Sequence, residues 1–552
     1  MNKNKHLLLW SSLGAIALLV TAAVQENFLK DWRLTQRGLR AEAGPIDVRL
    51  RQIIVPGLKA TDRCVTCHVG MAPGEQGTTG SQVAQAHKPA VHDPADYGCT
   101  VCHGGQGLAT EKADAHGDVL FWPEPMIPIR FAQAGCGSCH TYAGVPEQQQ
   151  LSHARNLVER YDCLVCHRVD GRGGTLRPTG TGGMEGPDLS RVGVTGWDKD
   201  WYDKHLQQTH EAADRRWTDS FGSVDKADLD GINSFLATRV AAPRLVEAAS
   251  LFHSLGCRGC HKVGGVGGDD GPDLTHEGEK DPGRLDFAHI PGEPTLANWL
   301  AEHFCLPAEV VPNSRMPAMG LDENQIELLT LYMLSLRRGD YPGSYWPKDR
   351  LRTERLSERE FAVDSATLYG TFCSGCHGLQ GEGMRYPGVP PFPAIANPDF
   401  LAVASDEFIA ATIKLGRPGR RMSAWGDPAS GLRPAEVTAV VSHLRQMGST
   451  SAPPPDARPA RWAKGNVADG AKFFAVNCQG CHGDKGQGIE GPALHNKTLL
   501  DNATDTYLSQ TISRGRRGTA MIAFAQPSTV YPALTPAEIE SIVSFIRTWE
   551  RP

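Results

Sequence analysis

The 552-residue chain lacks a strong excess of charge of one sign and a second long apolar run, and it has almost no cysteines outside one repeated motif. Its formal net charge is −6, so no basic surface for nucleic acid is indicated. Only residues 7–24 form an apolar run long enough to span a bilayer, which argues against a multi-span membrane protein. Fourteen of the fifteen cysteines belong to one repeated motif, and this motif carries most of the chemistry that the sequence reveals.

The repeated motif is Cys-x-x-Cys-His, and it occurs seven times. It is the attachment motif of c-type haem, in which both thiols bond to the haem and the histidine is the proximal iron ligand. Structural zinc sites use paired ligand couples, and thiol redox enzymes carry one such motif rather than seven. The sequence therefore predicts seven covalently bound haem c groups. The predicted attachment cysteines are Cys64, Cys67, Cys99, Cys102, Cys136, Cys139, Cys163, Cys166, Cys257, Cys260, Cys373, Cys376, Cys478 and Cys481. The predicted proximal ligands are His68, His103, His140, His167, His261, His377 and His482.

The N-terminal residues predict a membrane segment. A basic start, MNKNKH, precedes the apolar run at 7–24, whose length is at the lower limit of a bilayer span. A cleaved secretory signal with small residues near 20–22 is the alternative. The run is longer than an ordinary signal core, and residues 25–40 continue as a plausible helix, which favours an uncleaved single-pass anchor. Positive charge before the run predicts a cytoplasmic N-terminus, with the haem-binding part on the periplasmic side of the inner membrane.

The spacing of the motifs divides the chain into two parts. The first three motifs lie within residues 64–140, which leaves too few residues per haem for separate cores and predicts one loop-rich trihaem domain. The last four are spread over 163–482, so each has enough residues for a small domain. The predicted fold is mainly α, and its predicted parts are an N-terminal transmembrane anchor with a following helix (1–44), a trihaem domain (45–150) and four tandem monohaem domains (151–242, 243–340, 361–448 and 465–552). Linkers are predicted near 338–360 and 448–466, the second a semi-rigid, Pro-rich spacer.

The four later units share a pattern. Each has a helical approach to its motif and ends in a helix with an apolar period near 3.6. Between them lie the related segments EGPDL, DGPDL, PFPAI and EGPAL. Residues from about 150 to 552 thus resemble class I cytochrome c domains, which implies small all-α folds with the haem in a cleft. The resemblance also implies that a proline carbonyl accepts a hydrogen bond from the second nitrogen of each proximal histidine. The matching prolines are Pro187, Pro272, Pro393 and Pro492.

The class I pattern places a methionine before the last helix as the second axial ligand. A methionine ligand raises the haem potential relative to a histidine ligand. Three units have a methionine there in a polar Arg/Gly loop, with Met319 as a rival in the first loop. In the unit of His167, Trp217 stands in this place, and an indole does not bind iron. The predicted methionine ligands are Met316, Met422 and Met521.

The second ligand of the His167 haem is left open by the sequence. Met184 and His210 are candidates, and an open iron position is a further alternative. His205 is less favoured, because its counterpart His303 lies in a unit that already has a methionine.

The trihaem domain has no methionine loop of this kind. Its spare histidines, His87, His92 and His116, are predicted as distal ligands, which would give bis-histidine haems of lower potential. His153 is a weaker candidate just beyond the domain. Cys305, the leftover cysteine, is predicted to be a small buried apolar side chain.

The function predicted from these features is electron transfer along a chain of haems. The N-terminal half resembles the membrane-anchored multihaem subunits that accompany bacterial bc-type quinol–cytochrome c oxidoreductases, through TDRCVTCHVG (61–70), YGCTVCHGGQG (97–107) and CGSCH with its preceding alanines (132–140). This resemblance implies a membrane complex of the cytochrome b/Rieske type as donor and a soluble cytochrome or an oxidase as acceptor.

Two alternatives remain. A multihaem reductase would use an open iron position in the His167 unit. However, the chain has no Cys-x-x-Cys-Lys variant and no clustered acid/base residues beside any motif, so no catalytic residues are predicted. A storage cytochrome without a fixed partner is disfavoured by the anchor and the defined order of domains.

Overall fold

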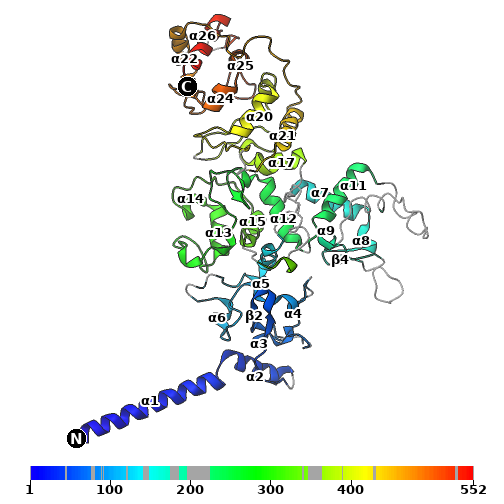
Figure 1. Cartoon of the computed structure of the whole chain (residues 1–552), viewed down its shortest axis with the longest axis vertical. Helices are drawn as coiled ribbons and strands as arrows, with labels where there is room; N and C mark the ends of the chain where they lie inside the picture. Colours follow the sequence, from blue (N-terminus) through cyan, green and yellow to red (C-terminus); the bar gives the residue numbers. More distant parts are fainter. Residues whose placement is uncertain are drawn as a thin grey trace.

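The computed structural model is mainly helical, as the sequence predicts, and its described parts contain three two-stranded sheets. In Figure 1 the chain forms a column, from whose lower end α1 (Asn2–Phe28) projects, and the C-terminus lies near its upper end. One unit, with α7 (Gln148–Arg160) and α11 (Lys226–Ala237), lies at the side of this column. The structure describes residues 2–43, 46–75, 77, 81–88, 90, 92–119, 122, 124–140, 148–174, 186–195, 205, 224–240, 242–337, 341–345, 364–387, 389–426, 431–528 and 532–550.

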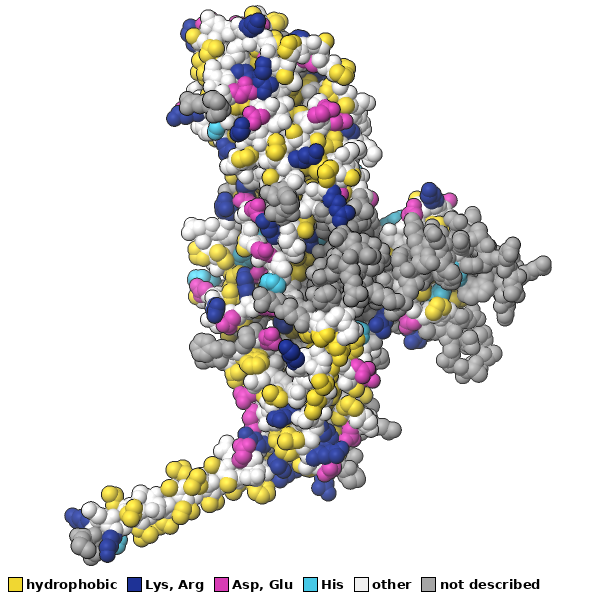
Figure 2. Space-filling model, viewed as in Figure 1, with side chains coloured by type: hydrophobic (Ala, Val, Ile, Leu, Met, Phe, Trp, Pro, Cys, Tyr) yellow, Lys and Arg dark blue, Asp and Glu magenta, His cyan; other side chains and the backbone are white. Residues whose placement is uncertain are grey.

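The first helix stands apart from the rest of the protein. Its residues Lys3–Phe28, 26 in number, form a segment long and apolar enough on average to cross a membrane, and its most apolar stretch has no buried part. Figure 2 shows hydrophobic side chains along its length and basic ones near its free end. A second helix, α2 (Asp31–Ala43), starts after a two-residue break, so the predicted continuation through 25–40 is two helices rather than one.

The second helix is fixed to the segment that follows it. Gln36 of α2 has no exposed surface, and its amide nitrogen donates to the carbonyl oxygens of Arg49 (2.8 Å) and Thr66 (2.7 Å). Trp32 and Leu39 are buried on the same helix. The break between α1 and α2 therefore separates an unburied helix from a docked one.

Residues 46–140, here called the three-motif segment, are loop-rich. An antiparallel hairpin of β1 (Ile53–Val55) and β2 (Ala60–Asp62) supplies most of a small apolar core, against which Tyr341 and Tyr345 pack from a later part of the chain. The remaining elements are short: η1 (Pro56–Leu58), α3 (Cys64–Cys67), η2 (Val69–Met71), α4 (Pro94–Tyr97), α5 (Thr100–His103), α6 (Lys112–His116) and η3 (Ile129–Ser138).

Four units follow, and each has a helix before its motif and a helix at its end, as the sequence predicts. The two helices of each unit pack against each other and bury apolar side chains between them. The pairs are α7 with α11, α12 (Pro243–Ser254) with α15 (Glu323–Ser335), α17 (Ser365–Phe372) with α21 (Pro434–Met447), and α22 (Val467–Asn477) with α26 (Pro536–Arg547).

The four units are of two kinds. In the first two, a short antiparallel hairpin follows the motif: β3 (Arg168–Val169) with β4 (Arg172–Gly173), and β5 (Lys262–Val263) with β6 (Val266–Gly267). In the last two, the motif turn ends at a glycine with φ of 82°, and two further helices precede the methionine loop. The remaining elements are α8 (Cys163–Cys166), α9 (Val192–Thr195), η4 (Cys257–Gly259), η5 (Glu277–Glu279), η6 (Pro282–Arg284), α13 (Leu296–Cys305), α14 (Pro307–Val310), η7 (Gly343–Tyr345), α18 (Ser374–His377), α19 (Pro398–Leu401), α20 (Asp406–Leu415), α23 (Gln479–His482), α24 (Lys497–Asn502) and α25 (Asp505–Arg514).

Two large apolar cores hold the units together. The first combines Ile127 and Phe131 of the three-motif segment with side chains of α7, α11, α12 and α15. Because η3 packs on α15, the three-motif segment lies directly below the unit of α12 and α15, and the unit of α7 and α11 lies beside them (Figure 1). The second core joins the last two units. The spatial order along the column thus differs from the order along the chain.

The Pro-rich linker is docked rather than free. Arg461 donates to the carbonyl oxygens of Leu500 (2.5 Å) and Ala503 (2.9 Å), and the Trp462 indole donates to the hydroxyl of Thr506 (2.8 Å). The end of the linker is therefore part of the last unit and not a spacer.

Candidate haem-binding sites

All seven Cys-x-x-Cys-His motifs adopt the same turn. In each, the backbone N–H of the histidine donates to the carbonyl oxygen of the first cysteine, with N···O distances of 2.8–3.0 Å. One helical turn therefore brings two thiols and an imidazole together on a short piece of backbone. All fifteen cysteines are among the described residues and have free thiols. This donor set fits covalently attached haem c, which needs two free thiols and one imidazole.

In each of the four later units, the motif histidine is oriented by a proline carbonyl. Its Nδ1 donates to that oxygen, which leaves Nε2 as the nitrogen with a free lone pair for a metal. The hydrogen bonds predicted from the class I resemblance are thereby confirmed. The pairs are His167 with Pro187 (2.8 Å), His261 with Pro272 (2.9 Å), His377 with Pro393 (2.9 Å) and His482 with Pro492 (2.8 Å).

The residue before the proline also shapes the site. In three units it is a glycine whose backbone lies against the imidazole, so that a Cβ there would stand 2.4–2.8 Å from an atom of the ring. A side chain at these positions would push the imidazole aside. The Gly-Pro steps of the sequence therefore have a packing role as well as a hydrogen-bonding one. The glycines are Gly186, Gly271 and Gly491.

Burial keeps most motif imidazoles in the neutral form that binds a metal. In six of the seven motif histidines, burial is the largest cause of a lowered pKa, and it lowers the pKa of His140 to about 4. The other five are His68, His103, His261, His377 and His482.

Neighbouring motifs touch through their thiols. The Cys64 side chain lies beside that of Cys99, and the Cys260 side chain beside that of Cys376, each pair close enough for one thiol to lower the pKa of the other. The first contact joins two motifs of the three-motif segment. The second joins the units of α12 and α17, where Ser374 also donates from its hydroxyl to the carbonyl oxygen of Ser254 (3.0 Å). The predicted haem attachment points of different units thus meet at shared edges.

Two predicted distal histidines lie opposite motif histidines. The ring centroids of His87 and His103 are 6.1 Å apart, and those of His92 and His140 are 6.2 Å apart. The ring planes meet at 65° in the first pair and 23° in the second. The structure therefore pairs these histidines, which the sequence left unpaired.

The third predicted distal histidine, His116, lies near His68. Burial is the main cause that lowers the pKa of His68, and the charge of His116 is the next. His153, the weaker candidate, is exposed on α7.

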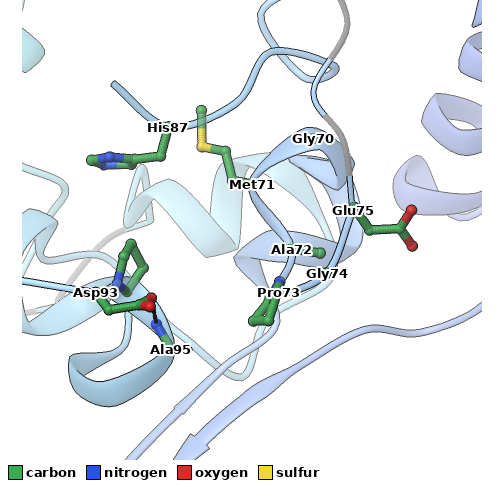
Figure 3. Close-up of a pocket in the computed structure, with 10 residues that line it drawn as sticks. Gly70, Met71, Ala72, Pro73, Gly74, Glu75, His87, Asp93 and Ala95 are labelled. Atoms are coloured by element: carbon green, nitrogen blue, oxygen red, sulfur yellow. Dashed lines mark hydrogen bonds between the residues drawn. The ribbon is translucent and has the colours of Figure 1, made fainter. Parts of the chain in front are cut away.

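A cavity of about 310 Å³ adjoins His87. Figure 3 shows the His87 and Met71 side chains at one side of it and Asp93 and Ala95 at the other. The lining residues are Gly70, Met71, Ala72, Pro73, Gly74, Glu75, His87, Asp93, Pro94 and Ala95.

The structure describes one further histidine at the His167 site. Met184, His210 and Trp217 lie outside the described residues. His205 is described, and its ring centroid lies 6.4 Å from that of His167, with the planes at 81°. Among the described residues, the histidine that the alignment with His303 disfavoured therefore lies beside His167.

The predicted methionine ligands lie in half-buried loops. The carbonyl oxygen of Met422 accepts from the N–H of Arg417 (2.8 Å), and that of Met521 accepts from Arg516 (2.7 Å), so the last two units share one loop design. Met316 packs against the first apolar core, and its N–H donates to a serine hydroxyl (3.2 Å). Their role as ligands stays a prediction.

Asp62 is a site residue that sequence reasoning missed. Its carboxylate is fully buried and accepts hydrogen bonds from the N–H groups of Cys99 and Thr100 and from the Thr100 hydroxyl. It therefore fixes the start of the second motif against the first. The contact spans 37 residues, and no sequence pattern joins the two positions.

The prediction for Cys305 is wrong. This cysteine is exposed rather than buried. It is the last residue of α13, and the next residue, Leu306, is 42% exposed, so the helix ends at the surface.

Comparisons with known proteins agree with this chemistry. The cytochrome c family matches three segments, residues 245–337, 362–448 and 467–550. They contain the three units of α12, α17 and α22. Cytochrome c domains carry covalently bound haem c, so the family match and the motif turns point to the same cofactor.

Curated relatives are subunits of cbb3-type cytochrome c oxidases. Subunit FixP of Bradyrhizobium sp. (strain ORS 278) is 32% identical over 162 residues, which are 28% of this chain and 51% of that protein. Subunit CcoP of Helicobacter pylori (strain 52) is 23% identical over 201 residues, 36% of this chain and 63% of that protein. The chain thus spans between half and two thirds of the length of these relatives.

A solved structure of the Kuenenia stuttgartiensis reducing HAO-like protein complex Kustc0457/Kustc0458 covers 34% of this chain and 96% of its own, at 18% identity. Its TM-score of 0.23 is too low to support an argument. The family match, the oxidase-subunit relatives and the repeated motif turn carry the assignment, and the N-terminal helix fits a single-pass membrane anchor. The chain is a multihaem c-type cytochrome with repeated cytochrome c domains.

Proposed function

We propose that this protein is a heptahaem electron carrier that accepts electrons from a membrane quinol-oxidising complex of the cytochrome b/Rieske type. It delivers them to an extracytoplasmic acceptor, a soluble cytochrome or an oxidase. Bound haem c supplies reversible one-electron transfer. The motif cysteines hold each group, the motif histidines bind its iron, and three methionine loops complete the sites of the last three units. The basic residues in the first turns of α1 support an inner-membrane anchor with the remainder in the periplasm.

The observation that carries the proposal is the contact between successive motifs. Besides the two thiol contacts, Gly135 lies so close to the second motif that a Cβ would stand 1.9 Å from the carbonyl oxygen of Cys102. Between the last two units, the Asn496 amide donates to the carbonyl oxygen of Pro418 (3.1 Å). Such contacts join the first three motifs to one another, the unit of α12 to that of α17, and the last two units to each other, which favours a carrier that moves electrons between units.

A subunit of a terminal oxidase is the second candidate. The relatives named above are cbb3-type oxidase subunits, and this observation favours an oxidase as the bound partner. The two candidates share the haem-binding chemistry and differ in the membrane complex to which the protein is attached.

Affinity purification of the tagged full chain from mildly solubilised membranes tests the proposal. Mass spectrometry should identify a cytochrome b and a Rieske protein as partners, and intact mass should exceed that of the polypeptide by seven haems. A chain without residues 2–28 is the control for non-specific capture. Recovery of oxidase catalytic subunits alone would favour the second candidate, and recovery of neither complex would contradict both.

A further inference from the structure

We propose that His205 binds the iron of the His167 site on the face opposite His167, which makes this a bis-histidine site. The inference rests on the proposed haem at the motif of Cys163 and Cys166, and it names the ligand that the sequence left open. It replaces the expected ligands Met184 and His210 and the open position.

The separation of the two rings is the first observation. The centroids of His167 and His205 are 6.4 Å apart. Metal–imidazole bonds of about 2 Å place two nitrogens about 4 Å apart across one metal and the ring centres about 6 Å apart. The hydrogen bond from Nδ1 of His167 to Pro187 fixes Nε2 as the nitrogen with the free lone pair. The pair therefore has the spacing that two axial imidazoles need, and His167 has the tautomer that leaves Nε2 for iron.

A contact between rings without a metal can fall in the same distance range, so the other ring pairs of the structure give the comparison. Three motif histidines each face one other histidine, with centroids 6.1, 6.2 and 6.4 Å apart. Their interplanar angles are 65°, 23° and 81°. When rings pack without a metal, the distance between their centroids depends on the angle between their planes, and near-parallel rings lie closer together. The stacked rings of Trp299 and His303, for example, are 5.0 Å apart at 7°. Edge-to-face rings reach the same separation without a metal, as Tyr386 and Phe392 do at 6.3 Å and 79°. The near-parallel pair of His92 and His140 is wider than stacked rings that touch, so it leaves room for an atom between them, and the His167 pair has almost the same separation.

The assignment places the His167 site with the histidine pairs of the three-motif segment. Two imidazoles give a lower potential than an imidazole and a methionine. With both axial positions filled by side chains, no iron position is left for a substrate. The unit at the side of the column is then an electron-transfer branch and not the site of a reductase.

The test uses the full chain, with His205→Ala and His205→Met as variants and His210→Ala and Met184→Leu as controls. We expect wild-type protein, reduced with dithionite, to bind no carbon monoxide at this site. His205→Ala should gain one carbon monoxide-binding haem among seven and lose one ferric low-spin EPR signal, and added imidazole should restore that signal. The lost signal should be strongly anisotropic, because the two ring planes are nearly perpendicular. His205→Met should stay six-coordinate and move one redox transition upward.

The assignment is overturned if His205→Ala leaves the spectra unchanged, or if a control variant opens the site instead. A further variant, Cys163→Ala with Cys166→Ala, removes the attachment thiols. The new carbon monoxide signal of His205→Ala should disappear when the two changes are combined. Peptide mass spectrometry that finds no haem on residues 163–167 of the wild-type protein would instead contradict the proposed haem at this motif, so the two failures are distinguishable.

Discussion

At Asp62, one carboxylate without exposed surface holds the start of the second motif. Asp62 shows which kind of site residue the sequence does not reveal, and the proline contacts show which kind it does. The bond from His261 to the carbonyl of Pro272 could be predicted, because both positions belong to one local pattern that the class I resemblance contains. The contacts of Asp62 with Cys99 and of His205 with His167 could not, because they join residues whose spacing no local pattern fixes.

Replacing Asp62 by asparagine should destabilise the three-motif segment. The variant loses the negative charge and turns one acceptor oxygen into a donor, so the buried N–H groups of Cys99 and Thr100 lose part of their hydrogen bonding. We expect a loss of about 1–3 kcal/mol in the free energy of unfolding, measured by denaturant titration of the full chain. Asp47→Asn is the control, because its side chain is 75% exposed. Equal stability of the two variants would show that the Asp62 contacts do not hold the fold.

At the scale of elements, the long helices were predictable and the short ones were not. The apolar period of residues 323–335 is sufficient to predict α15, whereas single turns such as η2 depend on contacts with distant residues. The last helices carry a device that the sequence did not reveal. Arg445 of α21 donates to Asp406 and to the carbonyl oxygens of Leu401 and Ala404, at the start of α20. In the same way, Arg547 of α26 donates to Asp505 and to the carbonyl oxygens of Leu500 and Ala503, at the start of α25.

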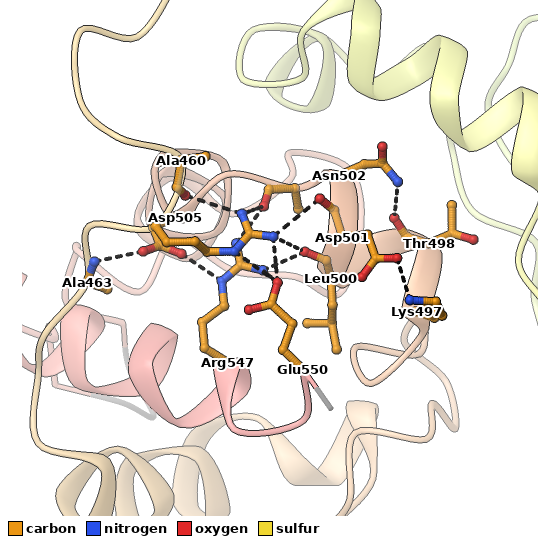
Figure 4. A network of polar contacts seen from close by, with 12 residues as sticks. Ala460, Ala463, Lys497, Thr498, Leu500, Asp501, Asn502, Asp505, Arg547 and Glu550 are labelled. Carbon is orange, nitrogen blue, oxygen red and sulfur yellow. Dashed lines mark hydrogen bonds and ion pairs between the residues drawn. The ribbon is translucent and has the colours of Figure 1, made fainter. Parts of the chain in front are cut away.

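Figure 4 shows this device in the last unit, where Arg547 lies between Asp505, Glu550 and the backbone of residues 500–503. Arg547→Ala should destabilise the unit, because it leaves the carboxylate of Asp505, which is 2% exposed, without its cation. We expect a loss of about 3–5 kcal/mol in the unfolding transition of the C-terminal unit, followed by circular dichroism.

Lys472→Ala serves as the control for Arg547→Ala, since its ion pair with Asp469 is mostly exposed. That variant should change the free energy of unfolding by less than about 0.5 kcal/mol. A loss as small as this in Arg547→Ala would mean that the linker residue Arg461, which also bonds to Glu550, suffices to hold the turn.

At the scale of the whole molecule, chain order and spatial order differ. The sequence placed the unit of His167 between the trihaem domain and the later units, because it follows one and precedes the other. In the structure, η3 packs directly on α15, and the unit of α7 and α11 lies at the side (Figure 1). Apolar periodicity identifies which helices have partners, but the choice among several similar partners depends on the shapes of the packed surfaces.

Replacement of residues 2–28 by a cleaved secretory signal, which keeps export, should release the protein from the membrane without unfolding it. The most apolar stretch of this helix is unburied, so its loss removes little packing. We expect a soluble protein with the same haem content by intact mass and an unchanged unfolding midpoint. Deletion extended to residue 43 should differ, because α2 carries the buried Trp32 and Gln36. Retention of the shorter deletion in the membrane fraction would assign membrane attachment to another part of the protein.

Residues 341–345 pack on the small apolar core of the three-motif segment, and this contact has a consequence for biosynthesis. Tyr345 packs so closely on η1 that a Cβ on Gly57 would stand 2.8 Å from its hydroxyl, and Tyr341 joins the same small core. A ribosome makes the chain from its N-terminus, so the first core stays incomplete until almost 300 further residues have been made, as the separation of residues 57 and 345 shows. During that interval the first three motifs belong to an unfinished domain whose attachment thiols are still open to the maturation machinery. The two tyrosines, which are made late, therefore complete the core of the part of the protein that was made first.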